Sequence, residues 1–298
     1  MYQADKMNKL DALDKKALAE TLARRALHYR MDIIEMIARA GSGHPGGSLS
    51  ALDLISTLYH YKLRHRPKQP DWPERDRFVL SKGHGVPAQY AVMADLGYFP
   101  RETLWTLRQL GSPLQGHPCA SWLPGMEAST GSLGQGLSIA QGLALASRLD
   151  GGKWRVYCLV GDGEIQEGQI WEAALSATKF QLDNLTVLLD YNKAQIDGYV
   201  HDVMNLEPVA DKWRSFGWHV ISINGHDYAE IIAALDEAEK VNVRPTLIVA
   251  HTVKGKGVSF MENVVSWHGV APSREEADRA ILEIQSQPGF SATKEALR

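Results

Sequence analysis

Short, nearly continuous apolar runs alternate along the chain with longer stretches in which apolar residues recur at helical spacing. The clearest apolar runs are Arg155–Val160 and Leu185–Leu189. Such runs are typical of strands buried on both faces of a parallel sheet. In Asp14–Ala40, by contrast, apolar side chains return every three or four positions with arginines between them. This spacing predicts one long helix.

The rest of the chain continues the alternation. Further strands are predicted at Phe78–Leu80, at the end of Trp213–Ile223 and at Pro245–His251, and further helices at Ser48–Tyr61, Val86–Leu96, Arg101–Gln109, Gly136–Leu149 and Asp227–Lys240. Strands that alternate with helices predict an α/β fold, with a mostly parallel sheet covered by helices on both faces. No repeat or linker divides the sequence. We therefore expect a single domain over residues 1–298, with an N-terminal helix at 14–40 and a charged, peripheral tail at 272–298.

Composition changes this picture little. Of the 298 residues, 44% are hydrophobic and 22% are charged, as in ordinary globular proteins. The net charge of −3 gives no reason to expect nucleic acid or a membrane surface as a partner. The two cysteines, Cys119 and Cys158, imply no disulfide framework, and Cys158 is expected to be a buried thiol within a strand. The charged N-terminus and the lack of a long apolar run predict a soluble, cytoplasmic protein.

Two polar side chains directly follow the two clearest apolar runs. Asp162 stands in Gly161-Asp162-Gly163 after the first run, and Asn192 comes shortly after the second. Open parallel sheets bind ligands at the carboxyl ends of their strands, and glycines let the backbone approach a ligand closely. One anionic and one neutral oxygen suit Mg²⁺, which completes its octahedron with phosphate oxygens. Taken separately the residues would be a turn and a helix cap, but together they favour a metal–diphosphate site.

A glycine-rich segment, Gly41–Gly47, matches the dinucleotide-binding pattern G-x-G-x-x-G. That fingerprint follows a strand and opens a helix. Here a predicted helix precedes the segment instead. The sequence context therefore disfavours a dinucleotide site.

Four of the eleven histidines lie in glycine-bearing loops near the ends of predicted elements: His44, His84, His117 and His268. Loops at the carboxyl edge of a parallel sheet are where such folds place their chemistry. Imidazole suits proton transfer near neutral pH and hydrogen bonding to the hydroxyls of a sugar. A zinc cluster is the competing interpretation, but no H-E-x-x-H or C-x-x-C spacing supports it.

In this order the chain contains G-S-G-H-P-G, S-K-G-H-G, G-H-P, T-G-S-L-G-Q-G, G-D-G-E-I-Q-E-G-Q-I-W-E-A and W-H-G. From about His28 to Pro272 it resembles the N-terminal half of transketolase. The resemblance implies a thiamine diphosphate-binding fold with thiamine diphosphate and Mg²⁺ as cofactors. It implies that Asp162, Asn192 and the backbone carbonyl of Ala194 hold the metal.

The resemblance also implies roles for the loop residues. His44, His84, His117 and His268 would surround the reactive carbon and the substrate hydroxyls, with His84 also near the cofactor diphosphate. Gly131 and Leu133 would contact the cofactor rings. Gly161 and Gly163 would flank its diphosphate.

Two groups of charged residues, three glutamates and two lysines, have competing interpretations. By resemblance, Glu167 and Glu172 belong to a carboxylate network between paired active sites. Glu164 and Glu167 would also suit the start of a helix, where acidic residues complement the dipole. Lys254 and Lys256 follow a predicted strand and could meet a phosphate, but a solvated turn explains them equally well.

The chemistry of the family is divided between two halves. A glutamate that protonates the aminopyrimidine ring, and the arginines for the substrate phosphate, belong to a pyrimidine-binding domain that this sequence does not match. The resemblance therefore implies the N-terminal subunit of a split transketolase. Its partner would be a C-terminal subunit carrying the pyrimidine-binding domain, in a heterotetramer. A domain cut from a full-length enzyme would show the same pattern.

The expected reaction moves a two-carbon ketol unit from a ketose phosphate to an aldose phosphate. His44 and His268 would deprotonate or position the donor hydroxyl, and His117 would hold its oxygens. The alternatives are a subunit related to 1-deoxyxylulose phosphate synthase or 2-oxo acid dehydrogenase, which decarboxylate, and a noncatalytic thiamine diphosphate-binding protein. Glu167 and the histidine loops favour transketolase.

Overall fold

The computed structural model describes Leu10 and residues 13–292 of the chain. Its centre is a five-stranded sheet in the order β1-β2-β3-β7-β6, and every neighbouring pair is parallel. The strands are β1 (Arg77–Leu80), β2 (Val156–Gly161), β3 (Leu185–Tyr191), β6 (His219–Asn224) and β7 (Thr246–His251). The register places Gly161 beside Asp190 and Tyr191 beside His251. The carboxyl ends of β2, β3 and β7 therefore finish at one edge of the sheet.

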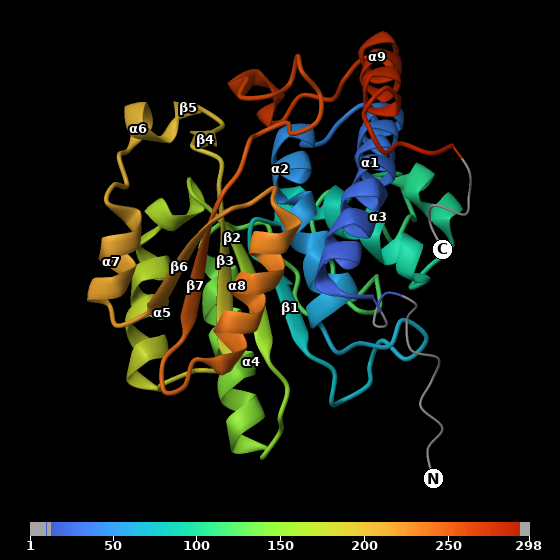
Figure 1. Cartoon of the computed structure of the whole chain (residues 1–298). Helices are drawn as coiled ribbons and strands as arrows, with labels where there is room; N and C mark the ends of the chain where they lie inside the picture. The colour runs from blue at the N-terminus through green and yellow to red at the C-terminus, as the bar shows by residue number, and fades with distance from the viewer. Residues whose placement is uncertain (1–9, 11–12, 293–298) are drawn as a thin grey trace.

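Alternate side chains of the strands enter two separate hydrophobic cores. The helices of the first core are α1 (Lys15–Ala40), α2 (Pro45–Thr57), α3 (Val86–Leu96), α8 (Tyr228–Lys240) and α9 (Arg274–Gln285). Those of the second are α4 (Gln135–Leu149), α5 (Gly168–Lys179) and α7 (Val209–Ser215). In β2, Tyr157 and Leu159 face the first core while Cys158 and Val160 face the second. The α/β fold with helices on both faces is confirmed (Figure 1).

The long N-terminal helix ends where the sequence predicts. Asp14 is the N-cap, and its side chain accepts a hydrogen bond from the Ala17 amide at 2.8 Å. Gly41 closes the helix in the left-handed region, with φ of 63°, which glycine adopts without a steric penalty. Asp227 caps α8 in the same way as Asp14.

Two predicted helices differ in extent from those observed. The helix predicted at Ser48–Tyr61 starts earlier, at Pro45 in the first turn of α2, a position where proline is favoured. Its last turn, Leu58–Lys62, widens into a π-helix. The segment Arg101–Gln109 forms only a short 3₁₀ helix, Arg101–Thr106.

The C-terminal segment is more firmly packed than predicted. Part of the expected peripheral tail forms α9, which begins with a capping box between Ser273 and Glu276. Ala277, Ala280 and Ile284 are fully buried in the first core. In Figure 1, α9 lies alongside α1. Residues 293–298 lie outside the described part of the chain.

The small residues of α4 do not share one face. Ala140 and Ala144 are buried against the second core, whereas Gly142 is exposed. The hairpin of β4 (Ala194–Gln195) and β5 (Gly198–Tyr199), with α6 (Val200–Val203), follows β3. Among the described residues, no helix is both long and apolar enough to cross a bilayer.

Candidate active site

The two predicted metal ligands come together at the carboxyl edge of the sheet. Asp162 and Asn192 lie one residue past β2 and β3 respectively. Asp162, 2% exposed, accepts hydrogen bonds from the backbone amides of Gly163, at 2.7 Å, and Lys193. The Oδ1 atom of Asn192 accepts one from the Ala194 amide at 3.1 Å. The hydrogen bond from Lys193 to Asp162 joins the loop after β3 to the loop after β2. Both loops carry side-chain oxygen atoms of the kind that can bind a metal ion.

A buried ion pair that the sequence pattern did not predict lies beneath Asn192. Asp190, at the end of β3, pairs with Lys82 in the loop after β1, and both are at most 2% exposed. Asp190 also accepts hydrogen bonds from Ser50 at 2.6 Å, from Thr252 and from Asn192 Nδ2 at 3.2 Å. The amide nitrogen of Asn192 points to Asp190, so its Oδ1 points away from that carboxylate. A metal ligand needs this orientation, because the amide oxygen is the atom that can bind a cation.

All four histidines singled out in the sequence converge. The ring centroid of His44 lies 5.2 Å from that of His84, 6.1 Å from that of His117 and 5.7 Å from that of His268. The rings of His84 and His268 are 5.1 Å apart. The histidines come from the loop before α2, the turn after β1, the loop before α4 and the segment after β7. No set of three or more His, Cys, Asp or Glu side chains in the described residues is arranged to hold a metal ion.

The cluster is electrically neutral near pH 7. Burial, reinforced by the Arg108 charge, lowers the pKa of His44 to about 4. Burial and the neighbouring Lys254 lower the pKa of His268 to about 3. Burial also lowers the pKa of His84 and His117. Each neutral imidazole offers one N–H donor and one lone-pair acceptor.

The depressed pKa values predict a loss of stability in acid. In the unfolded chain His44 and His268 titrate near 6.5, so the unfolded state binds protons that the folded state does not. The free energy of unfolding should therefore fall as the pH drops below 6.5. After discounting for solvent screening, we expect about 1 kcal/mol per histidine by about pH 5.5. Urea unfolding of the wild type and of His268→Gln at pH 7 and at about pH 5.5 measures this, and equal losses in the two proteins would contradict it.

Lys254 links the metal ligands to the histidines. Its side chain is 1% exposed, and Nζ lies 2.8 Å from both the Ala194 carbonyl oxygen and His268 Nδ1. An ammonium group can only donate, so His268 Nδ1 accepts and its proton is on Nε2. Burial and Lys82 lower the pKa of Lys254 to about 8. The solvated-turn interpretation is thus wrong for Lys254, but it fits Lys256, which is partly exposed and pairs with Glu262 at 3.3 Å.

The acidic residues after β2 differ in their surroundings. Glu164 is buried and accepts hydrogen bonds from Ser81, from the Gly134 amide and from the Gly161 amide, the last two at 3.0 Å. It joins the loops after β1 and β2 to the start of α4, a role that the helix-dipole interpretation missed. Glu167 and Glu172 are exposed, so their predicted network stays a prediction.

The loop before α4 packs against the histidine cluster. Gly131 has φ of +145°, and a Cβ there would lie 3.0 Å from the His117 ring. A Cβ on Gly83 would lie 2.9 Å from the Thr130 carbonyl carbon. These contacts require glycine and bring Gly131 beside His117, while Leu133 is 36% exposed.

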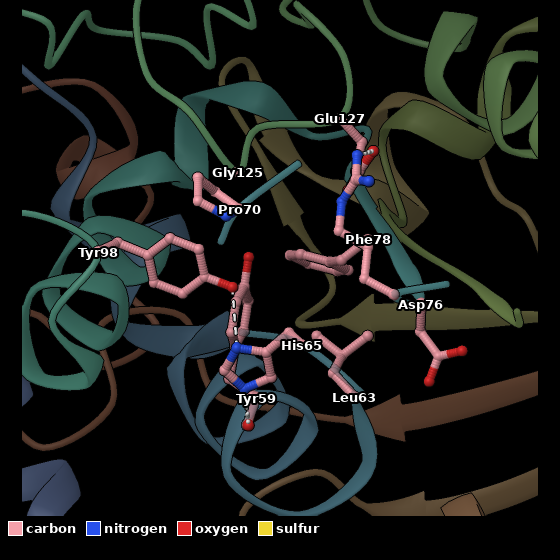
Figure 2. Close-up of a pocket in the computed structure, with 10 residues that line it drawn as sticks. Tyr59, Leu63, His65, Pro70, Asp76, Phe78, Tyr98, Gly125 and Glu127 are labelled. Carbon is pink, nitrogen blue, oxygen red and sulfur yellow. Dashed lines mark hydrogen bonds and ion pairs between the residues drawn. The ribbon is translucent and has the colours of Figure 1, made fainter. Parts of the chain in front are cut away.

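A separate pocket lies away from this site. Figure 2 shows the His65 ring directed at the Tyr98 hydroxyl, with 2.8 Å between Nδ1 and the oxygen. Arg75 binds Glu127 through two 2.9 Å hydrogen bonds in the same wall. The wall also contains Asp76, so the pocket lies at the amino end of β1. The histidine cluster lies beyond its carboxyl end.

The fold and site define a thiamine diphosphate-binding domain. Residues 22–296 match the family described as "Transketolase, thiamine diphosphate binding domain". The chain is 46% identical over 266 residues to the 6-deoxy-6-sulfo-D-fructose transketolase subunit of a Clostridium species, covering 89% of this chain and 97% of that protein. It is 41% identical to an apulose-4-phosphate transketolase subunit of Phocaeicola vulgatus, covering 90% of this chain and 95% of that protein.

Comparison with solved structures leads to the same family. Transketolase from Campylobacter jejuni superposes with a TM-score of 0.86 at 36% identity, over 93% of this chain and 45% of that one. The chain belongs to the transketolase family and corresponds to its thiamine diphosphate-binding part. It spans less than half of that longer transketolase.

The residues present fit a metal-bound diphosphate. Burial, and then the adjacent Asp190 charge, raise the pKa of Asp162 to about 6, so a cation beside this carboxylate would favour its ionised form. Asn192 Oδ1 and the Ala194 carbonyl add neutral oxygens of the kind that Mg²⁺ prefers. The buried ammonium of Lys254 supplies positive charge for an anionic ligand.

Proposed function

We propose that this chain is the thiamine diphosphate- and Mg²⁺-binding subunit of a two-chain transketolase that transfers a two-carbon ketol unit between sugars. The convergence of four neutral histidines beside the Asp162–Asn192 loops carries the proposal. The relatives whose whole length the chain nearly covers are named transketolase subunits. The same names favour ketol transfer over decarboxylation and over a noncatalytic role.

Asp162, Asn192 and the Ala194 carbonyl would hold the metal, and Lys254 would neutralise charge on the diphosphate. When bound, thiamine diphosphate supplies the nucleophilic carbon and the electron sink for carbon–carbon cleavage. His44 is half-buried, and its neutral ring lies among the other three histidines, so its lone pair can accept a proton from a donor hydroxyl. His268 presents Nε2–H because Lys254 occupies Nδ1, and it can donate a hydrogen bond to a sugar oxygen.

The partner would be a chain with the pyrimidine-binding domain, including the glutamate that contacts the aminopyrimidine. Three exposed apolar side chains, Leu133 before α4, Ile139 on α4 and Leu175 on α5, support the docking of a second chain on this part of the molecule. Glu167 and Glu172 are exposed at the start of α5, where a second chain could bury them. We propose a heterotetramer, which light scattering of the co-purified complex tests. The cytoplasmic location stays a prediction.

The substrates would be sugars with a terminal anionic group. Ketose and aldose phosphates, as in the pentose phosphate pathway, are the first candidates. The name of the Clostridium relative makes a sulfonated ketose a specific second candidate. Chromatography of the shortened aldose, after the complex is supplied with an aldose phosphate as acceptor and with either fructose 6-phosphate or 6-deoxy-6-sulfo-D-fructose as donor, separates them. No ketol transfer from any donor would overturn the proposal.

Replacing His44 by alanine should lower turnover far more than cofactor affinity. The ring removed lies among the histidines rather than at Asp162 or Asn192, and general acid–base catalysis contributes about 10²- to 10⁴-fold. We expect kcat to fall by about 100-fold or more and the Kd of thiamine diphosphate to change by less than about threefold. Steady-state kinetics and calorimetry of the reconstituted complex measure both, and unchanged turnover would remove His44 from the mechanism.

A further inference from the structure

The turn between β6 and α8 carries a histidine that uses both ring nitrogens. His226 Nδ1 lies 2.7 Å from Asp53 Oδ2, and Nε2 lies 2.8 Å from the backbone nitrogen of Val253. A backbone N–H can only donate, so Nε2 is the acceptor. The proton of the ring is therefore on Nδ1 and is donated to Asp53.

Asp53, on α2, is a fixed acceptor for this ring. It is 2% exposed. Arg30 Nη2 donates to its two carboxylate oxygens at 2.9 and 2.7 Å, and the Tyr228 hydroxyl donates at 2.6 Å. Burial opposes ionisation, but the Arg30 charge and the hydrogen bonds from His226 and Tyr228 hold the pKa of Asp53 well below its ordinary value. The carboxylate that orients His226 is therefore charged and bound from three sides.

The same network holds the loop that follows β7. Val253 N–H is bound by His226, and the Lys256 carbonyl accepts a hydrogen bond from Arg30 Nε at 3.1 Å. Between these two points lies Lys254, whose Nζ reaches the Ala194 carbonyl and His268. The backbone on both sides of Lys254 is thus bound to residues that themselves bind Asp53.

We propose that His226 is a positioning residue for Lys254: by accepting the Val253 N–H it fixes the loop from which the buried ammonium reaches the cofactor site. The inference rests on the proposed function, which places the diphosphate beside Lys254. His226 does not touch that site itself. Its effect passes through the Val253 amide, and its bond to Asp53 serves to orient the ring.

Two amide variants separate the two hydrogen bonds of the ring. His226→Gln places an amide oxygen near the position of Nε2 and can keep the Val253 bond. His226→Asn places its amide near Nδ1, so it can keep the Asp53 bond but leaves Val253 N–H unpaired. Calorimetry of the complex with thiamine diphosphate and Mg²⁺ should give a Kd near that of the wild type for Gln. For Asn it should be about tenfold weaker, the order expected for one unpaired buried donor.

His219, at the start of β6, provides the matched control. His219 pairs with Glu237 at 2.7 Å, far along the strand from the loop after β7, so His219→Asn should leave the Kd unchanged. Equal affinities of the two His226 variants, or weaker binding by Gln than by Asn, would overturn the inference while leaving the proposed function standing. A wild-type complex that binds no thiamine diphosphate would overturn the proposed function itself.

Loss of folding is separated from loss of positioning by a double-mutant cycle. Both His226 variants are repeated in a Lys254→Met background, and apo melting temperatures are recorded for every protein. If His226 acts through Lys254, the tenfold difference between Gln and Asn disappears in that background. If the difference persists without the ammonium, the inference is wrong.

Discussion

Asp162→Ala is expected to abolish binding of thiamine diphosphate and Mg²⁺ by the complex of this chain with its partner. Asp162 is the charged member of the oxygen set at the ends of β2 and β3. Losing a mere outer-shell partner of a metal costs about 10- to 100-fold in affinity, so losing this carboxylate should cost more. Titration calorimetry of the reconstituted complex measures the effect.

The loss should not come from unfolding. Removing the carboxylate relieves the unfavourable burial of its charge beside Asp190 but leaves the Gly163 and Lys193 amides without their acceptor. Because these two effects oppose each other, the apo melting temperature should change little. Asp211→Ala is the control, because the Asp211 side chain is 70% exposed and its ion pair is with the neighbouring surface residue Arg214. Binding retained in Asp162→Ala would place the diphosphate elsewhere and remove the basis of the proposed function.

Asp190→Ala should strongly destabilise the fold itself. The substitution leaves the buried ammonium of Lys82 without its carboxylate and removes the acceptor shared by Ser50, Thr252 and Asn192. Breaking a buried ion pair from one side costs about 3–5 kcal/mol. Urea unfolding of the apo chain at pH 7 gives this value from the shift in the transition midpoint.

A double variant tests the cause of that loss. Lys82→Met combined with Asp190→Leu removes both charges and should recover part of the stability, since an apolar pair often replaces a buried ion pair at little cost. Recovery should be incomplete because Ser50 and Thr252 still lack their acceptor. A single Asp190→Ala variant as stable as Asp211→Ala would show that the buried pair contributes little.

Local sequence patterns were enough to predict most of the fold. Arg155–Val160 and Leu185–Leu189 are largely apolar because alternate side chains enter different cores, so the pattern alone indicated two-sided burial. Asp14, Gly41 and Asp227 marked helix ends because capping depends on adjacent residues. The helix α9 within the tail was not predicted because its charged residues outnumber the few positions that pack on α1.

Part of the candidate site was predicted because glycines mark the loops in which its histidines lie. The four histidines were identified in this way, and Asp162 and Asn192 were identified by their positions after the two clearest apolar runs. Lys82, Asp190 and the buried state of Lys254 were not, because their burial depends on contacts between segments far apart in the chain. One local signal was available: a charged residue such as Asp190 at the end of a largely apolar run is seldom buried without a partner.

The separation of the hydrophobic interior into two cores bears on how the cofactor site responds to strain. His44 and Lys82 belong to loops leading into the helices of one layer, whereas Gly131 and Glu164 lead into those of the other. On the proposed function, a ligand at the shared edge of the sheet would touch both sets. Sliding of one helical layer relative to the other would then change the spacing between the imidazoles and a diphosphate bound there. The geometry of such a site would depend on the rigidity of five strands that themselves contribute few of its side chains.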